Sequence, residues 1–331
     1  VEASYEAGPP SRVLCTSLAA PGPENVRFEI SLNAQQYTTD ANHFNFYQPP
    51  RVHDLSPSTG PVHGDTFVRV TGVGFEGGSH YLCMFAMLDS PSTQLRVPAT
   101  FVSTHLTTCV APLITADSAV AYRLRVSLNG QQFSPHADTP AAYGFHGYSE
   151  VHAASPNSGP VVGGTLVTID GVHLGNGSDY RCRFGGSTVN ASYSVPRDVV
   201  SCFSPRMPVA ASILLEVSQN GQQFTASGRS YSFYGPSSML ALDSSIAYLH
   251  PLAGPTGGTT LVGVHGHALA GGSDYRCKFG HIDGIPATVV SSELITCHSP
   301  ALPIGAVNVS IALNAQQYMS MPLPNFTFYE P

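Results

Sequence analysis

The seven cysteines are the residues of this sequence with the clearest capacity for chemistry, since a thiol can form a disulfide or bind a metal. Six of them occupy two recurring positions, one in a Tyr-x-Cys-x-Phe stretch and one just before a proline-containing turn. The pairs in register are Cys83 with Cys109, Cys182 with Cys202, and Cys277 with Cys297. We expect each pair to form a disulfide that links neighbouring strands or the loops beside them. The alternative is a set of buried, reduced thiols in a cytosolic protein.

The seventh cysteine, Cys15, matches the second position of such a pair, and we expect its partner to lie outside this segment. Residues 1–49 contain no "GPxxGGT" portion, which opens the other repeats, so we expect the chain to begin inside a repeat. The apolar residues of 26–32, with Phe44 and Phe46, then form a face without covering strands. Either those strands lie upstream in a longer array, or a neighbouring chain donates them and builds a head-to-tail filament.

Four Asn-x-Ser/Thr sequences are acceptors for N-linked glycans, and they point to the secretory pathway. They stand at Asn176, Asn190, Asn308 and Asn325. Val307, Val309, Ile311 and Leu313 alternate with Asn308, Ser310 and Ala312, so a strand here turns Asn308 away from the core. Phe326 is expected to face the core, so the adjacent Asn325 is expected to face outward. We expect glycans at all four sites, on a surface otherwise poor in charge.

Other residue types that could do chemistry are few, and none forms a catalytic pattern. The sequence has no HExxH, GxSxG, Walker or GxGxxG motif. His265 and His267 could share one strand face and hold a metal, but no third ligand is nearby. Asp170, Asp179 and Asp274 do not have the spacing of a calcium loop, and the last two recur in "GSDYRC", where turn capping is the plainer interpretation. We therefore expect no enzyme activity, no metal, no calcium and no cofactor.

One hairpin sequence recurs four times, as LNAQQY at 32–37, LNGQQF at 128–133, QNGQQF at 219–224 and LNAQQY at 313–318. The first glutamines are 96, 91 and 94 residues apart, which is the length of an immunoglobulin-like module. Asn-Gly and Asn-Ala predict a two-residue hairpin whose first glutamine faces the core and whose second faces outward. The outward residues are Gln36, Gln132, Gln223 and Gln317, candidates for a repeated lateral contact. Recent duplication explains their sameness equally well.

Composition limits the class of protein. The 331 residues include 32 glycines and 27 prolines and show no long helical period, so we predict an all-β chain. A net charge of −7 with Lys278 as the single lysine argues against a nucleic-acid surface. No apolar run approaches the ~20 residues that cross a bilayer, so we expect no direct membrane insertion in this segment.

The repeat "SPNSGPVVGGTLVTIDGVHL", the "VVSCFSP" turn and the closing "NGQQF…YSFYGP" resemble the IPT/TIG module of plexins, fibrocystin-like surface proteins and some transcription factors. The resemblance implies tandem immunoglobulin-like sandwiches of the E-set type in a linear rod. It divides the chain into a C-terminal half repeat at 1–49 and full repeats at 50–147, 148–235 and 236–331. The first full repeat departs from the pattern, with Gly64-Asp65 where the second has two glycines.

The leading functional hypothesis is a non-enzymatic structural or adhesive glycoprotein at the cell surface, which assembles head to tail into a fibril. Its partners would be other copies of itself or adjacent modules, with cell-surface proteins or glycans as further candidates. The alternative is the spacer and ligand-binding region of a receptor ectodomain. A module that accompanies a catalytic domain is a third hypothesis.

Overall fold

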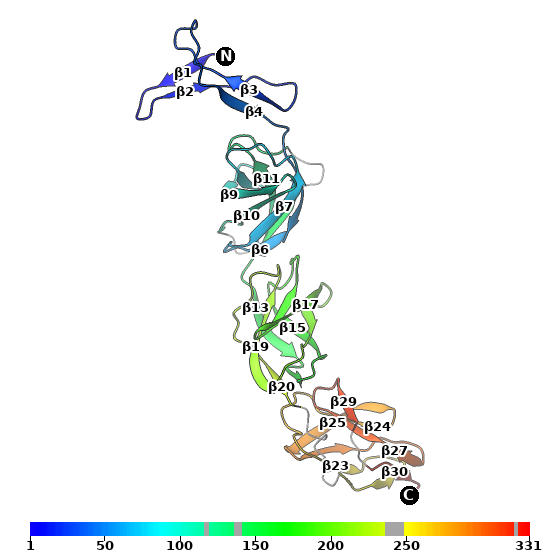
Figure 1. Ribbon diagram of the computed structural model, residues 1–331. Helices are drawn as coiled ribbons and strands as arrows, with labels where there is room; N and C mark the ends of the chain where they lie inside the picture. Colours follow the sequence, from blue (N-terminus) through cyan, green and yellow to red (C-terminus); the bar gives the residue numbers. More distant parts are fainter. Residues whose placement is uncertain (116–118, 136–140, 236–247, 321–323) are drawn as a thin grey trace. The chain divides into compact units, whose positions relative to one another are not determined.

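The structure is a computed structural model that describes residues 1–115, 119–135, 141–235, 248–320 and 324–331 (Figure 1). All regular structure in these described residues is β-strand, as the repeat pattern predicts. The chain divides into two compact units, one drawn mainly from the residues before 146 and the other mainly His146–Pro331. The expected start of the last repeat, at 236, lies outside the described residues, and so do residues 236–247 of the stretch 235–247, for which the sequence suggests the longest joint between modules.

The first full sandwich is built from eight strands. These are β5 (Arg51–Ser56), β6 (Thr59–Pro61), β7 (Phe67–Val73), β8 (Leu82–Met87), β9 (Gln94–Ser103), β10 (Leu106–Val110), β11 (Val120–Ser127) and β12 (Ala142–His146). Their order is β5-β7-β10-β9-β8-β11-β12-β6. Strand β9 joins the two layers, because its first half pairs with β8 and its second half with β10.

The second sandwich repeats this order as β13-β15-β18-β17-β16-β19-β20-β14. Its strands are β13 (Glu150–Ser155), β14 (Ser158–Pro160), β15 (Leu166–Val172), β16 (Arg181–Phe184), β17 (Ser187–Ser194), β18 (Val199–Phe203), β19 (Ala211–Ser218) and β20 (Ser230–Tyr234). The short β14 pairs parallel to β20, and every other pairing in this sandwich is antiparallel.

The third sandwich has the order β21-β23-β26-β25-β24-β28-β29, with a three-stranded sheet β22-β30-β27. Its strands are β21 (Tyr248–His250), β22 (Ala253–Pro255), β23 (Leu261–His265), β24 (Arg276–Phe279), β25 (Ile282–Ser291), β26 (Leu294–His298), β27 (Gly305–Val307), β28 (Val309–Ala312), β29 (Tyr318–Ser320) and β30 (Phe326–Tyr329). Both the second and the third sandwich belong to the second compact unit.

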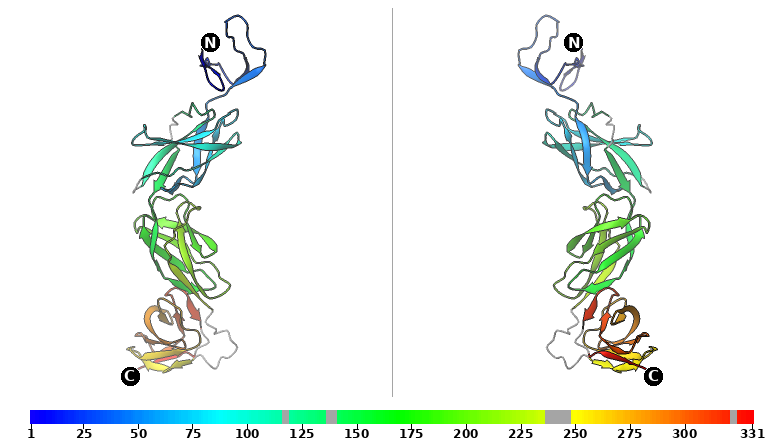
Figure 2. Two further views of the ribbon diagram at one scale, coloured as in Figure 1. Left: turned by 90° about the vertical axis from the view of Figure 1, so that its left-hand side faces the viewer. Right: turned by 90° about the vertical axis from the view of Figure 1, so that its right-hand side faces the viewer.

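Residues 1–49 form two separate ribbons: β1 (Ala3–Glu6) pairs with β2 (Arg12–Cys15), and β3 (Glu24–Phe28) pairs with β4 (Asn42–Phe46). Long loops connect these strands (Figure 2). Phe28 is 42% exposed and Phe44 is 43% exposed, so the apolar face expected here is only partly covered within the described residues. A two-stranded ribbon has no second layer to bury such a face.

Each full sandwich has the same aromatic core, because the Phe of the Tyr-x-Cys-x-Phe stretch meets an aromatic residue of a late strand edge to face. The pairs are Phe85 with Tyr143 at 5.4 Å and 83°, Phe184 with Tyr231 at 5.2 Å and 85°, and Phe279 with Phe326 at 5.5 Å and 87°. All six residues have relative exposures below 2%. The repeat of sequence is therefore a repeat of one packing arrangement.

The predicted alternation of 307–313 holds only in part. Asn308 is exposed while Val309, Ile311 and Leu313 are buried, as the period of two requires. Ser310 and Ala312, which the pattern places outward, are also buried. β28 is hydrogen-bonded to β24 and β29 at its two edges, and at this end the residues on both of its faces are buried.

Candidate functional site

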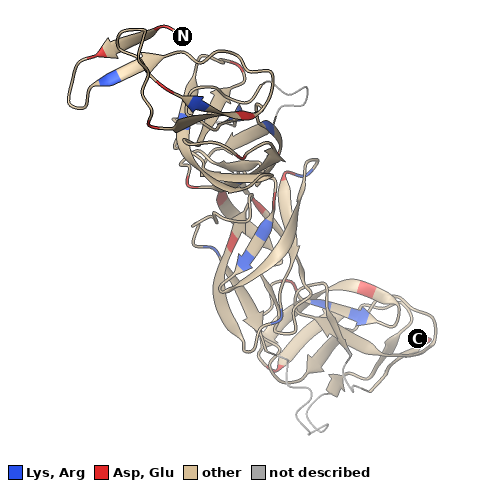
Figure 3. Cartoon of the chain, turned by 45° about the horizontal axis from the view of Figure 1, so that its top comes forward, with Lys and Arg blue, Asp and Glu red and all other residues tan. Residues whose placement is uncertain are grey.

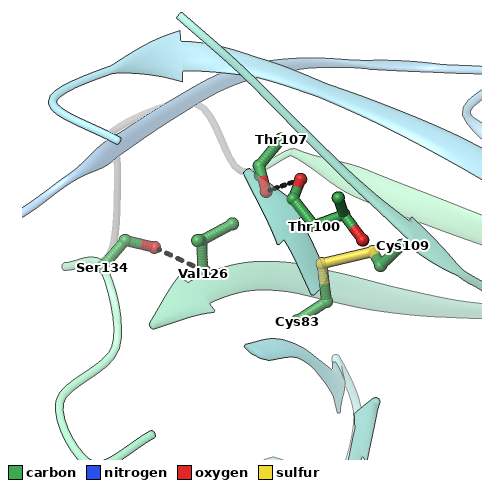
Figure 4. Close-up of a disulfide and its surroundings, with 6 residues drawn as sticks. All are labelled: Cys83, Thr100, Thr107, Cys109, Val126 and Ser134. Atoms are coloured by element: carbon green, nitrogen blue, oxygen red, sulfur yellow. Dashed lines mark hydrogen bonds between the residues drawn. A yellow bond between two sulfur atoms is a disulfide. The ribbon is translucent and has the colours of Figure 1, made fainter. Parts of the chain in front are cut away.

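Three disulfides join the six cysteines in the expected pairs. Cys83–Cys109 has a Cα–Cα distance of 6.4 Å, and Cys182–Cys202 and Cys277–Cys297 have 6.5 Å each. Figure 4 shows the first of them, beside the hydrogen bond from Thr107 Oγ1 to the carbonyl of Thr100. Cys83 and Cys109 are 0% and 4% exposed, so the bond lies in the core.

The disulfides do not link hydrogen-bonded neighbours, which corrects the sequence-based expectation. Cys83 lies on β8 and Cys109 on β10, and both strands pair with β9 between them. The third sandwich repeats this, since β24 and β26 both pair with β25. Each bond therefore closes the fold at the point where the middle strand passes from one layer to the other.

Cys15 is exposed on β2, opposite Ala3, and it is free in this structure. Its expected pairing with a cysteine outside the segment stays a prediction.

The four glycan acceptors all lie on the surface. Asn176, Asn190, Asn308 and Asn325 are all exposed. Asn190 has one further constraint, because its Oδ1 accepts a hydrogen bond from Nη1 of Arg181. Glycosylation itself stays a prediction, but each site has the accessibility that it requires.

The recurring hairpin is not a two-residue turn, which corrects a second expectation. In the first full sandwich the Ser134 amide donates to the carbonyl of Val126 at 2.8 Å, so the loop between the paired strands is longer. Its centre is Asn129, whose Oδ1 accepts from the amides of Gln131 at 3.0 Å and Gln132 at 3.1 Å. This side chain replaces the backbone acceptor of a turn, an arrangement typical of asparagine.

The backbone after that asparagine has positive φ in all four copies. It is glycine in two, Gly130 at 75° and Gly221 at 74°, and alanine in two, Ala34 at 59° and Ala315 at 62°. Asn-Gly and Asn-Ala are therefore interchangeable here at the level of backbone conformation, although alanine carries the strain of its Cβ.

The assignment of the first glutamine is also wrong, whereas the second is exposed at Gln36 and Gln132, as expected, and half-buried at Gln223 and Gln317. The first glutamine of the pair (Gln35, Gln131, Gln222, Gln316) is exposed and does not cap the core. The amide oxygen of the second accepts from Nδ2 of the preceding asparagine within the same hairpin, at Gln36, Gln132, Gln223 and Gln317. A lateral contact through these second glutamines stays a prediction, and it would compete with this internal bond.

The last hairpin also contacts the second sandwich, within the same compact unit. Gln316 places its side-chain amide against the backbone of Leu166, with Oε1 accepting from the Leu166 amide at 2.9 Å and Nε2 donating to the Leu166 carbonyl at 2.9 Å. Asn314 Nδ2 donates to Thr165 Oγ1 at 3.1 Å, and that hydroxyl donates to Gln317 Oε1 at 3.2 Å. These residues were missed from the sequence because the first glutamine was assigned to its own core.

The candidate metal ligands have other partners. His265 stacks on Tyr248 with ring centroids 4.1 Å apart, while His267 Nδ1 lies 3.3 Å from Glu293. In the part of the chain that the structure describes, no group of three His, Cys, Asp or Glu side chains could hold a metal ion.

The two recurring aspartates are bound by arginine. Nε and Nη2 of Arg181 donate to the two carboxylate oxygens of Asp179 at 2.7 and 3.2 Å, and Arg276 does the same to Asp274 at the same two distances. The hydrogen bond to the carboxylate raises the pKa of each guanidinium. Asp170 is exposed on β15 and has no part in these pairs. Each carboxylate oxygen of Asp179 and Asp274 thus accepts a hydrogen bond from an arginine of its own module.

Charged residues are sparse along the strands of each unit (Figure 3). The ion pairs join residues on the same strand or on adjacent segments. An example is Arg183 with Glu216, on the paired strands β16 and β19, at 2.5 Å. Among the described residues no helix is long and apolar enough to cross a bilayer.

Two-layer sandwiches of this strand order, each with one internal disulfide, define a tandem array of immunoglobulin-like modules. The family model of the IPT/TIG domain matches residues 50–143, 149–233 and 244–328, more than half of the chain. The protein belongs to the IPT/TIG family, and its described modules are of the all-β class that the sequence predicts. Each matched segment lies inside one of the expected repeats.

Solved structures of similar fold include multidomain segments of plexin A4 and of chicken CNTN1. The full extracellular region of plexin A4 matches with 15% identity and a TM-score of 0.40, over 85% of this chain and 29% of that one. The FN1–FN3 domains of chicken CNTN1 match with 16% identity and a TM-score of 0.24, over 84% and 96% of the two chains. The chain thus spans less than a third of the plexin chain that it matches.

Proposed function

We propose that this chain is part of a non-enzymatic, extracellular structural or adhesive glycoprotein whose IPT/TIG modules assemble head to tail into a surface fibril. One observation carries the proposal: all three full modules place a buried disulfide at the same point of the fold. Such bonds persist in oxidising compartments and are rare in the cytosol.

Two further features support it. The four glycan acceptors are exposed, and glycans would solubilise a surface with only 11% charged residues. The hydrogen bonds between Gln316 and Leu166 join two successive modules of one unit, which suits a protein whose task is to keep modules in line. Its partners would be other copies or adjacent modules, and cell-surface proteins or glycans.

The second candidate function is the spacer and ligand-binding region of a receptor ectodomain. The same hydrogen-bonded joint favours it, because a spacer must hold a binding domain at a fixed distance. The two candidates differ in self-association, which a fibril requires and a spacer does not.

The test is to purify the protein from its native source and to measure its intact mass before and after removal of N-glycans, without and with reductant. We expect a mass loss on deglycosylation, glycans on the four sequons and oxidised cysteines in the three modules. Antibody labelling of unpermeabilised cells should detect the chain. Reduced cysteines, unmodified sequons and labelling only after permeabilisation would contradict the proposal.

A further inference from the structure

The contact between the last hairpin (residues 313–318) and the second sandwich extends a β-ladder by means of a side chain. Strand β13 ends at Ser155, which pairs with Thr168 of β15, and Pro156 follows with no amide hydrogen to donate. Leu166, two residues before Thr168, therefore has no β13 partner. The amide of Gln316 takes that place, since it donates to the Leu166 carbonyl and accepts from the Leu166 amide.

The third sandwich has the corresponding position, and its own first strand also leaves it unpaired. Strand β21 ends at His250, which pairs with Gly263 of β23, and Pro251 follows. Leu261 stands two residues before Gly263, as Leu166 stands before Thr168. The end of β21 thus leaves the backbone of Leu261 without a neighbour from that strand.

The threonine that precedes each of these leucines has the same hydrogen bonds in both sandwiches. The Thr165 amide donates to Ser204 Oγ at 3.1 Å, and the Thr260 amide donates to Ser299 Oγ at 3.1 Å. The returning bond is also the same, from the Ser204 amide to the Thr165 carbonyl and from the Ser299 amide to the Thr260 carbonyl, at 2.8 Å in both.

Exposure separates the occupied position from its counterpart. Thr165, under the docked hairpin, is 0% exposed, whereas Thr260 is only half-buried. Leu166 is 41% exposed and Leu261 is 55% exposed. We define residues 260–261 as the acceptor edge of the third module.

A matching hairpin exists elsewhere in the same chain. Residues 32–37 have the same six-letter sequence as the docked hairpin at 313–318. Asn33 Oδ1 accepts from the amides of Gln35 and Gln36 at 3.0 Å each, as Asn314 Oδ1 does from its own two glutamines at 3.2 and 3.1 Å. Gln35 is exposed, so its amide is presented as that of Gln316 is.

We propose that the acceptor edge binds the 32–37 hairpin of a second copy of this chain, with the amide of Gln35 on the backbone of Leu261 and Asn33 on the Thr260 hydroxyl. This deepens the assembly part of the proposed function, and it makes a head-to-tail contact of one kind. The internal joint has an additional bond from Ser158 Oγ to Ser273 Oγ at 2.9 Å. Ala253 occupies the position of Ser158 in the third module, so the contact between copies is weaker than the internal one.

The first test is sedimentation equilibrium of the 331-residue chain over a wide concentration range, with Cys15→Ser throughout to prevent accidental disulfides. We expect the average mass to rise above that of the monomer with concentration. Gln35→Ala and Thr260→Val should each weaken this association at least several-fold. The matched control is Gln48→Ala, which removes an exposed glutamine from the same N-terminal segment and should leave association unchanged.

Two outcomes overturn the proposal. One is a chain that stays monomeric at every concentration. The other is association that Gln35→Ala and Gln48→Ala affect equally, which would point to the apolar face around Phe28 and Phe44 and to donated strands.

A cross-linking experiment separates this proposal from the broader one. Chains with Gln35→Cys and chains with Leu261→Cys, both with Cys15→Ser, are mixed and treated with a short thiol-reactive cross-linker. A third chain with Leu166→Cys and Gln316→Cys reports on the internal joint. We expect both links to form. An internal link without the link between chains overturns the second-copy proposal and leaves the surface-glycoprotein proposal standing. Failure of both links also overturns the second-copy proposal. The internal contact between Gln316 and Leu166, on which that proposal is based, would then be absent in solution.

Discussion

Cys182 and Cys202 stand opposite Val189 and Ala191, two residues of β17 that are separated by a single position. Their disulfide therefore bridges the two strands on either side of β17 and fixes the point where this strand changes layers. The equivalent residues in the third module are Ile285 and Ala287.

The double substitution Cys182→Ser with Cys202→Ser should destabilise the second module by about 3 kcal/mol, since a bond closing a loop of this size restricts the unfolded chain by that amount. Hydrogen exchange of β16 to β18 in the intact chain, followed by mass spectrometry, measures the loss module by module. Exchange in the third module should not change. Cys15→Ser is the control and should leave every module as it was.

The glycine pair before β15 predicts two unequal substitutions. A Cβ at Gly163 would lie 2.6 Å from the carbonyl carbon of Pro205, whereas a Cβ at Gly164 would meet nothing within 4 Å, although φ is positive at both. The other modules have Asp65 and Thr259 at the second position, also with positive φ. Gly164→Ala should cost about 1 kcal/mol, the strain of a left-handed residue, and Gly163→Ala clearly more.

Hydrogen exchange of the second module, measured in both variants over a series of temperatures, compares their losses of stability. Equal losses at the two positions would show that backbone strain alone, and not the approach of Pro205, makes the first glycine necessary.

The asparagine at the centre of the hairpin predicts a local loss of stability. Asn129→Ala removes the acceptor for the amides of Gln131 and Gln132 and the donor to the Gln132 side chain. We expect a cost of about 1–3 kcal/mol and faster exchange at 130–134. Asn129→Asp keeps the acceptor and should lose less. Gln131→Ala, at an exposed side chain, serves as the control and should behave as the unaltered protein does.

Tyr193 predicts an alkaline dependence of stability. Its hydroxyl donates to Asp198 Oδ1 at 2.6 Å, and this hydrogen bond to a carboxylate raises the pKa of Tyr193 to about 12. The unfolded tyrosine ionises near pH 10. Between pH 10 and 12 the folded protein therefore holds a proton that the unfolded chain has released, so the contribution of Tyr193 is complete below pH 10 and is lost as the pH rises to 12.

Tyr193→Phe should lower stability below pH 10 and flatten its decline between pH 10 and 12. Chemical denaturation at a series of pH values measures this, and Tyr329→Phe, at an exposed residue, is the comparison. An unchanged slope in Tyr193→Phe would mean that the decline comes from other groups, such as Tyr143, whose pKa burial raises.

The sequence was informative where one residue type has one role. The register of the cysteines predicted the three pairs, and the spacing of the repeated hairpin predicted modules of the observed kind. It was uninformative where a side chain has several partners available. Asn129 was assigned to a hairpin turn by its neighbour Gly130, but it acts through its own Oδ1. No local pattern distinguishes these arrangements.

Contacts between modules were the least predictable. The backbone of Leu166 is available to Gln316 only because β13 ends at Ser155. The contact therefore depends on two segments that are 150 residues apart in the sequence. The same limit applies to the disulfides, whose strands are neighbours of β9, β17 and β25 and not of each other.

The position of the disulfides also determines how the chain would respond to a pulling force. In the second module 20 sequence positions separate Cys182 from Cys202, and a force applied at the two ends of the chain bypasses the residues between them. At about 3.4 Å per residue, the second and third modules, each with a separation of 20, would release roughly 70 Å less length when they unfold, unless the bond is reduced first. Reductant would thus act as a regulator of extensibility, lengthening the array without changing the number of its modules.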